Sequence, residues 1–91
     1  MEVFLMENIV KDYHIQTPAQ LKAALHSLRR AQRLSQLEFG RKVGLSQERI
    51  SAIENHPERI TTDQLLTLLM ALGVELVIKP RSLETKAPGI W

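Results

Sequence analysis

The sequence predicts an all-α protein, a compact domain of four to five helices with one β-strand after the last helix. Four segments begin with a threonine or serine that can cap a helix and continue with aliphatic residues at helical spacing. Aromatic residues make up 4% of the chain although hydrophobic residues make up 44%. An aliphatic core of this kind favours a helical bundle over a β-sandwich, and 91 residues correspond to one domain.

Two longer helices and the strand are predicted outside the middle of the chain. Residues 17–20, Thr-Pro-Ala-Gln, combine a threonine cap, a proline at the first helical position and a capping-box glutamine, and this helix extends to about Gln32. Residues 61–64, Thr-Thr-Asp-Gln, open a leucine-rich helix that ends at Gly73. The strand is Val-Glu-Leu-Val-Ile at residues 74–78.

Between the longer helices lie two shorter ones, hinged on Gly44. The first begins with a capping box at residues 35–38, and Leu37 and Val43 are expected to bury one of its sides. Gly44 ends it in the left-handed conformation that glycine tolerates. Ser46 caps the second short helix, which runs to about residue 54.

The second short helix is expected to present a polar front. Ile50 and Ile53 should point toward the core, and the step of about 100° per residue then fixes the other positions. Outward lie Glu48, Ser51 and Ala52, with Gln47 and Arg49 on the flanks. Two helices joined by such a short turn have the form of a helix-turn-helix, and the polar first turn of the second helix fits a DNA major groove.

Charge is distributed unevenly along the chain. Between residues 22 and 49 seven basic residues accompany two acidic ones: Lys22, Arg29, Arg30, Arg33, Arg41, Lys42 and Arg49 against Glu38 and Glu48. Between residues 50 and 78 the single base Arg59 accompanies four acids. This asymmetry suggests a face for a polyanion, and the alternative is an ordinary solvated surface.

Several functions are excluded or disfavoured. The chain has no cysteine, its three histidines lack metal-ligand spacing, and no cofactor or metal is expected. We expect no enzyme, because no catalytic triad and no glycine-rich phosphate loop is present. No signal peptide or membrane span is predicted, so the expected location is the cytoplasm.

The helix-turn-helix resembles that of phage-repressor/Cro-like (XRE) DNA-binding domains. The resemblance rests on LSQLE at residues 34–38, VGLSQ at 43–47 and ISAIEN at 50–55, and covers about residues 21–74. Gly40 departs from the pattern, which usually has alanine there, and glycine should slightly loosen its helix. The family pattern also implies an ion pair of structural importance between Arg29 and Glu54.

The resemblance assigns DNA contacts residue by residue. Phosphate contacts are expected from Gln36, and also from Arg33, Lys42, Asn55 and Arg59. Base contacts are expected from Ser46, Gln47, Glu48 and Arg49, with Ala52 against a thymine methyl group. Gln47 suits adenine and Arg49 suits guanine. Glu48 must accept from a cytosine amino group or pair with Arg49 instead. Ser35 and Ser46 serve at least partly as caps.

The whole chain resembles HipB-type antitoxins, the small partners of HipA-like kinase toxins. This closer resemblance rests on length, on Thr-Pro-Ala-Gln-Leu at residues 17–21, on Glu-Asn-His-Pro-Glu at 54–58, on the strand and on a tail ending in Trp91. It implies an antitoxin that represses its own operon and neutralises a HipA-like serine/threonine kinase. The alternatives are a free-standing repressor without a toxin and a protein-interaction module that has lost DNA binding.

The strand needs a partner, because one strand cannot satisfy its own backbone. Val74, Leu76 and Ile78 line one face, and we expect two copies to pair this strand across a two-fold axis in a homodimer. The alternative is pairing with Val-Phe-Leu-Met at residues 3–6. A dimer would place two reading helices about 34 Å apart, or a multiple of that, on an inverted-repeat operator.

We therefore divide the chain into an N-terminal arm (1–16), a helix-turn-helix domain (17–73), a dimerisation strand (74–79) and a C-terminal tail (80–91). The tail is polar and interrupted by proline, so disorder is expected there. Its terminal Trp91 is either an accident of the terminus or an anchor for a toxin partner, since tryptophan is favoured in interfaces.

Overall fold

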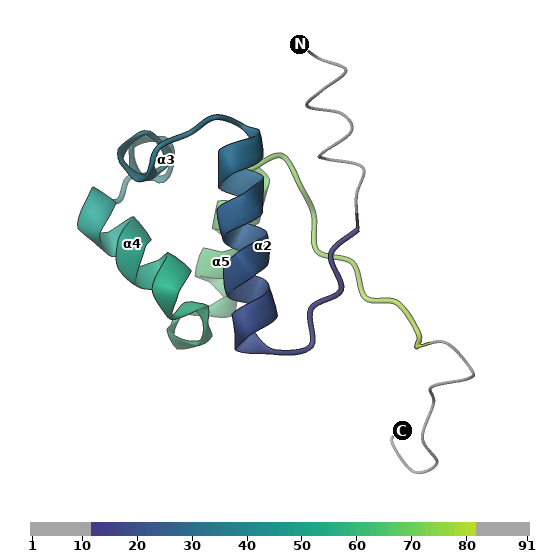
Figure 1. Cartoon of the computed structure of the whole chain (residues 1–91). Coiled ribbons are helices and arrows are strands. Elements are labelled where there is room, and N and C mark those ends of the chain that lie inside the picture. The colour runs from purple at the N-terminus through teal and green to yellow at the C-terminus, as the bar shows by residue number, and fades with distance from the viewer. Residues whose placement is uncertain (1–11, 82–91) are drawn as a thin grey trace.

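The computed structural model describes residues 12–81, which contain four α-helices and one short 3-10 helix (Figure 1). The elements in order are α2 (Pro18–Ala31), α3 (Gln36–Val43), α4 (Gln47–Asn55), η1 (Pro57–Arg59) and α5 (Thr62–Ala71). Figure 1 shows α3 and α4 together on one side of α2, with extended segments on the other side. The predicted all-helical domain is confirmed within the described range.

The helices begin where the sequence predicts. Thr17 Oγ1 accepts a hydrogen bond from the Gln20 backbone N–H at 3.2 Å, and Gln20 Oε1 accepts from the Thr17 N–H at 3.1 Å. Ser35 and Glu38 form the same reciprocal capping box at the start of α3. Thr61 Oγ1 caps α5 by accepting from the Gln64 N–H at 3.1 Å. Each cap satisfies backbone donors that a helix start leaves unpaired.

The core lies where the four α-helices meet. Its buried apolar side chains are Leu25 and Leu28 of α2, Phe39 of α3, Ile50 and Ile53 of α4, and Leu68, Leu69 and Leu72 in and after α5. Ile50 and Ile53 are 0% and 2% exposed, as predicted. The buried side of α4 is therefore fixed, and this determines which of its residues face outward.

The predicted buried side of α3 is wrong in one respect. Leu37 is 43% exposed, whereas Phe39 is 1% exposed and fills the core. Leu37 and Val43 are six positions apart, which places them roughly 120° from one another around a helix, whereas Phe39 and Val43 differ by only about 40°. The correct inward stripe therefore runs through Phe39, Val43 and the buried Gly40.

The turn between α3 and α4 depends on two glycines. Gly44 has φ 75° and ends α3 in the predicted left-handed conformation. Gly40 is buried, its carbonyl accepts from the Leu45 N–H at 2.8 Å, and a Cβ there would overlap the Leu45 carbonyl oxygen and lie 3.3 Å from Ile50 Cγ1. The expectation that Gly40 merely loosens its helix is therefore incomplete, because glycine permits a closer approach of the turn.

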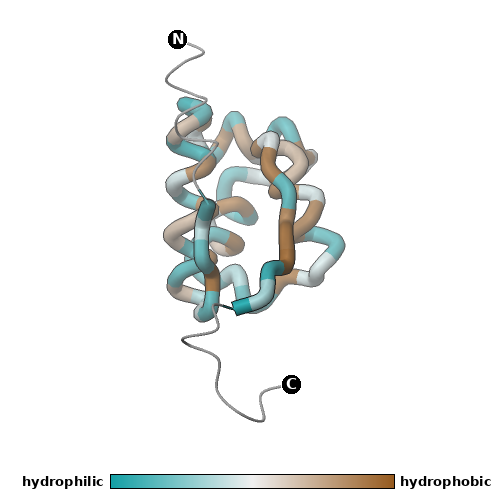
Figure 2. The backbone as a smooth tube through the Cα atoms, turned by 90° about the vertical axis from the view of Figure 1, so that its right-hand side faces the viewer, coloured by the Kyte–Doolittle hydropathy of each residue, from teal (hydrophilic) through white to brown (hydrophobic). Residues whose placement is uncertain are grey.

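Residues 12–16 and 74–81 are extended and run along the same side of the helical domain (Figures 1 and 2). They are linked by an ion pair between Lys79 Nζ and Asp12 Oδ2 at 3.5 Å and, with α2 and α5, they line an open cavity of about 1380 Å³. Residues 74–79 form no strand with any described residue. The alternative pairing with residues 3–6 lies outside the described residues, as does Trp91.

Candidate nucleic-acid interface

The five residues predicted to read bases all lie exposed at one end of α4 or along its outer side. They are Ser46, Gln47, Glu48, Arg49 and Ala52. Ser46 has a second role, because its Oγ accepts the Arg49 backbone N–H at 3.0 Å and caps the helix. The structure thus presents a short polar helix start on aliphatic supports, which is the shape a major groove accepts.

The predicted phosphate contacts differ in their surroundings. Arg33, Lys42, Asn55 and Arg59 are exposed, whereas Gln36 is half-buried at the first position of α3. Arg33 adopts φ 58° in the link between α2 and α3, which is unusual for a residue other than glycine.

A buried polar network joins α2, α3 and α4. Arg29 of α2 donates from Nε to Glu54 Oε2 at 2.6 Å and from Nη2 to Glu54 Oε1 at 3.2 Å, while its Nη1 donates to the Leu34 carbonyl at 2.7 Å. Arg29 and Glu54 are 7% and 5% exposed. Gln36 Nε2 also donates to Glu54 Oε1, at 3.3 Å. The expected ion pair is present, and it additionally orients the side chain at the start of α3.

The first turn of α4 makes a side-chain hydrogen bond to α5. Arg49 Nη2 donates to Gln64 Oε1 of α5 at 3.3 Å. Glu48 forms no ion pair with Arg49 or any other described residue. The alternative in which Glu48 pairs with Arg49 is therefore absent from the structure, and Gln64 is the partner that the sequence pattern did not reveal.

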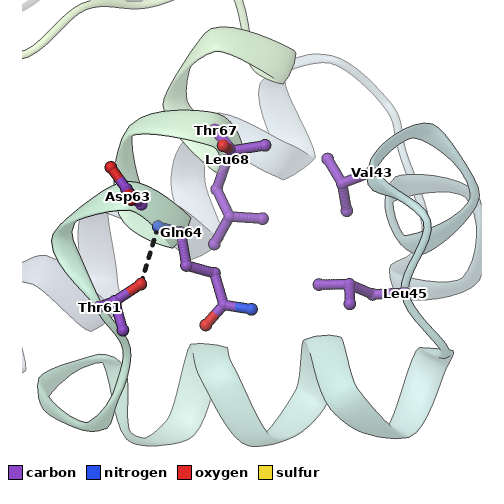
Figure 3. Close-up of a pocket in the computed structure, with 7 residues that line it drawn as sticks. All are labelled: Val43, Leu45, Thr61, Asp63, Gln64, Thr67 and Leu68. Atoms are coloured by element: carbon purple, nitrogen blue, oxygen red, sulfur yellow. Dashed lines mark hydrogen bonds between the residues drawn. The ribbon is translucent and has the colours of Figure 1, made fainter.

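A cavity of about 440 Å³ lies between α5 and the turn that precedes α4 (Figure 3). Its lining residues are Val43, Leu45, Thr61, Asp63, Gln64, Thr67 and Leu68. Figure 3 shows the Gln64 side chain extending from α5 toward α4 at the edge of this space. The cavity thus separates α5 from the α3–α4 turn, and Gln64 reaches across one side of it.

Two carboxylates at element starts have perturbed acidity. The Ser35 backbone N–H, followed by the Ser35 side chain and then Arg41, lowers the pKa of Glu38. The pKa of Glu58 is also lowered, first by its own backbone N–H and then by His56, whose Nδ1 lies 3.3 Å from Glu58 Oε2. Both shifts follow from hydrogen bonds to the charged form and serve capping and turn structure.

Other kinds of site are not seen within residues 12–81. No group of three or more histidines and acids there is arranged to hold a metal ion. No helix in the same range is both long enough and apolar enough to cross a membrane.

Together, the short helix pair, its tight glycine turn and the exposed polar start of α4 define a helix-turn-helix DNA-binding domain. A family model described as helix-turn-helix matches residues 25–78, more than half of the chain. The protein belongs to this helix-turn-helix family of the XRE type, which is a family of DNA-binding domains, and is a DNA-binding regulator. No curated protein and no solved structure matches the chain.

Phe39 and Gln64 are two residues beside the site that the sequence does not single out. The four-residue spacing between Phe39 and Val43 is a local signal for the burial of Phe39. No local signal predicts the contact of Gln64, because it lies 15 residues from Arg49 and only the tertiary fold brings the two side chains together.

Proposed function

We propose that the protein is a dimeric antitoxin that binds an inverted-repeat operator, represses its own operon and neutralises a HipA-like serine/threonine kinase. The DNA-binding part is supported by one observation above others. Ile50 and Ile53 are buried while Ser46, Gln47, Glu48, Arg49 and Ala52 are exposed. In this proposal those five residues meet base edges, and Gln36, Arg33, Lys42, Asn55 and Arg59 meet phosphates.

Selection from a randomised duplex library tests the DNA-binding half. The expected product is an inverted repeat, whose affinity falls steeply with salt because phosphate contacts release counterions. Gln47→Ala and Arg49→Ala should each lose preference at one base position of each half-site. Lys42→Ala should instead weaken binding to all duplexes and reduce the salt dependence. Recovery of no preferred sequence would contradict the proposal.

The dimer is supported by the segment at residues 74–79. Leu76 and Ile78 are 54% and 92% exposed, and the backbone of residues 75–79 makes no hydrogen bond to a described backbone group. Pairing two such segments would satisfy those groups and cover the apolar side chains. Val74, half-buried at the start of the segment, connects it to the core.

Sedimentation equilibrium tests this pairing. Proline removes a backbone donor, and alternate residues of a strand direct their N–H groups to the partner strand. Of the neighbouring residues Leu76 and Val77, one directs its N–H group to the partner strand. Therefore one of the variants Leu76→Pro and Val77→Pro should convert the dimer to monomer. Val77→Thr keeps strand propensity and should leave the dimer intact. A monomeric wild-type protein at tens of micromolar would overturn the dimer.

The antitoxin role rests on the resemblance to HipB-type proteins, with Trp91 as a proposed toxin contact. Capture of partners from the native host with the tagged full-length protein tests this role. The expected partner is a kinase, and Trp91→Ala should weaken its binding while DNA binding is unchanged.

The competing function is a free-standing repressor. The helix-turn-helix family match over residues 25–78 supports DNA binding and is equally compatible with this alternative. Absence of a kinase partner would favour the repressor.

A further inference from the structure

The contact between Arg49 and Gln64 suggests a role for a residue outside the helix-turn-helix. We propose that Gln64 of α5 is a positioning residue that directs the Arg49 guanidinium and so sets how strictly one operator base is recognised. The observation is the hydrogen bond from Arg49 Nη2 to Gln64 Oε1 at 3.3 Å. This inference rests on the proposed DNA-binding function and concerns the same site.

Gln64 is well placed to act as a fixed support. It lies in the first turn of α5, where its backbone N–H donates to Thr61 Oγ1 at 3.1 Å. It is half-buried, and its side chain extends toward α4 beside Leu68 (Figure 3). The cap fixes the backbone at Gln64, and the partial enclosure of the side chain restricts the rotamers that it can adopt.

Arg49, in contrast, has few other restraints. It is exposed, and its charged neighbour Glu48 makes no ion pair with any described residue. An unrestrained arginine loses rotamer freedom when it binds a base, which lowers affinity. The Gln64 contact orders the guanidinium before DNA arrives, so part of that entropy cost is removed from the binding step.

The contact is compatible with base recognition. A guanidinium has more N–H donors than a bidentate contact to guanine O6 and N7 requires, so one bond to Gln64 leaves enough for the base. The acceptor on Gln64 is neutral, and it therefore orients Arg49 without neutralising it. A carboxylate at this position would also accept from Arg49 but would repel nearby phosphates.

The probes are the duplex that the wild-type protein selects from a random library, each single-base variant of it, and a mixed-sequence duplex. Arg49→Ala is expected to lose roughly 5- to 150-fold of discrimination at one base position of each half-site. Gln64→Ala should lose roughly 2- to 10-fold at that same position, as expected for one hydrogen bond. The double variant should match Arg49→Ala, because Gln64 acts only through Arg49.

Two further variants sharpen the experiment. Thr67→Ala, which alters the same cavity one turn further along α5, should leave discrimination unchanged. Gln64→Glu should preserve the preferred base while weakening binding to every duplex. Circular dichroism should show all variants folded.

Four outcomes would overturn the inference. In the first, Gln64→Ala leaves discrimination intact, and in the second it relaxes a different base position, as a direct reader would. In the third it weakens all duplexes equally, as a phosphate contact would, and in the fourth its loss adds to that of Arg49→Ala. If the wild-type protein selects no sequence, the proposed function itself fails, and this result is distinct from the other four.

Discussion

The two ends of α4 are supported in opposite ways. At its C-terminal end, Glu54 is buried and accepts hydrogen bonds from Arg29 and Gln36. At its N-terminal end, residues 46–49 are exposed, and Arg49 donates a hydrogen bond to Gln64 of α5. The C-terminal end fixes the helix to the domain, and the N-terminal end exposes its polar side chains to solvent.

This difference has an energetic meaning. A buried ion pair is costly to desolvate, so its two partners depend on one another and the loss of one is severe. An exposed hydrogen bond contributes little to folding, because water replaces it when it breaks. The C-terminal end of α4 should therefore respond to mutation through stability, and the N-terminal end through recognition of DNA.

The largest effect is expected from Glu54→Ala. It leaves the Arg29 guanidinium buried without its carboxylate and should lower the free energy of unfolding by about 3–5 kcal/mol. That is a large part of the total stability of about 5–15 kcal/mol for a small domain. Urea denaturation measures it. The matched control is the double variant Arg29→Met with Glu54→Leu, which should recover most of the loss. A loss below about 1 kcal/mol would show that water reaches Arg29.

The second effect concerns the turn that brings α4 against α3. Gly40→Ala should destabilise the domain by about 1–3 kcal/mol, because the added Cβ displaces the Leu45 carbonyl. The sign is informative, since alanine otherwise gains up to about 1 kcal/mol over glycine in a helix. Arg41→Ala at the exposed neighbouring position serves as the control and should be nearly neutral. A stabilised Gly40→Ala would mean that the turn moves away at no cost.

The third effect separates folding stability from DNA recognition at the N-terminal end of α4. Ser46→Ala removes the cap of α4 and should lower the free energy of unfolding by about 1 kcal/mol. Ser46→Asp keeps a capping oxygen and should retain the stability, yet it adds negative charge where DNA is expected and should bind the selected duplex more weakly. Thermal denaturation and DNA titration measure the two properties. Equal stability of Ser46→Ala and wild type would assign Ser46 to recognition alone.

Local features of the fold are predictable from the sequence, whereas contacts between distant residues are not. The caps at Thr17, Ser35 and Ser46 were predicted because a cap acts within a few residues of chain. The inward direction of Ile50 and Ile53 followed from helical periodicity. The ion pair between Arg29 and Glu54 is predicted from the family resemblance. No local pattern predicts it, because 25 residues separate the two side chains.

The errors have equally physical causes. The prediction that Leu37 is buried is wrong because hydrophobicity alone does not determine burial, and because six residues do not return to the same helix face. The importance of Gly40 depends on how closely a distant backbone approaches, which sequence spacing does not contain. The pairing of residues 74–79 depends on a second chain and stays a prediction.

The smallest effect tests whether an exposed helix start contributes measurable stability at all. Glu38 accepts from the Ser35 N–H at 2.8 Å, and this bond lowers the pKa of its carboxyl group. A pKa that is lower in the folded state means that the ionised form stabilises folding. This contribution is complete above the unfolded pKa of about 4.3 and is lost as the pH falls through the lower folded pKa.

Glu38→Gln keeps the hydrogen-bonding shape without the charge. The stability difference from wild type should therefore be constant above the unfolded pKa and should close as the pH falls through the lower folded pKa. Glu48→Gln, in the first turn of α4 and without a capping bond in the described structure, is the matched control and should show a smaller difference. A gap for Glu38→Gln that persists unchanged in acid would show that the difference does not come from the charge of the carboxylate.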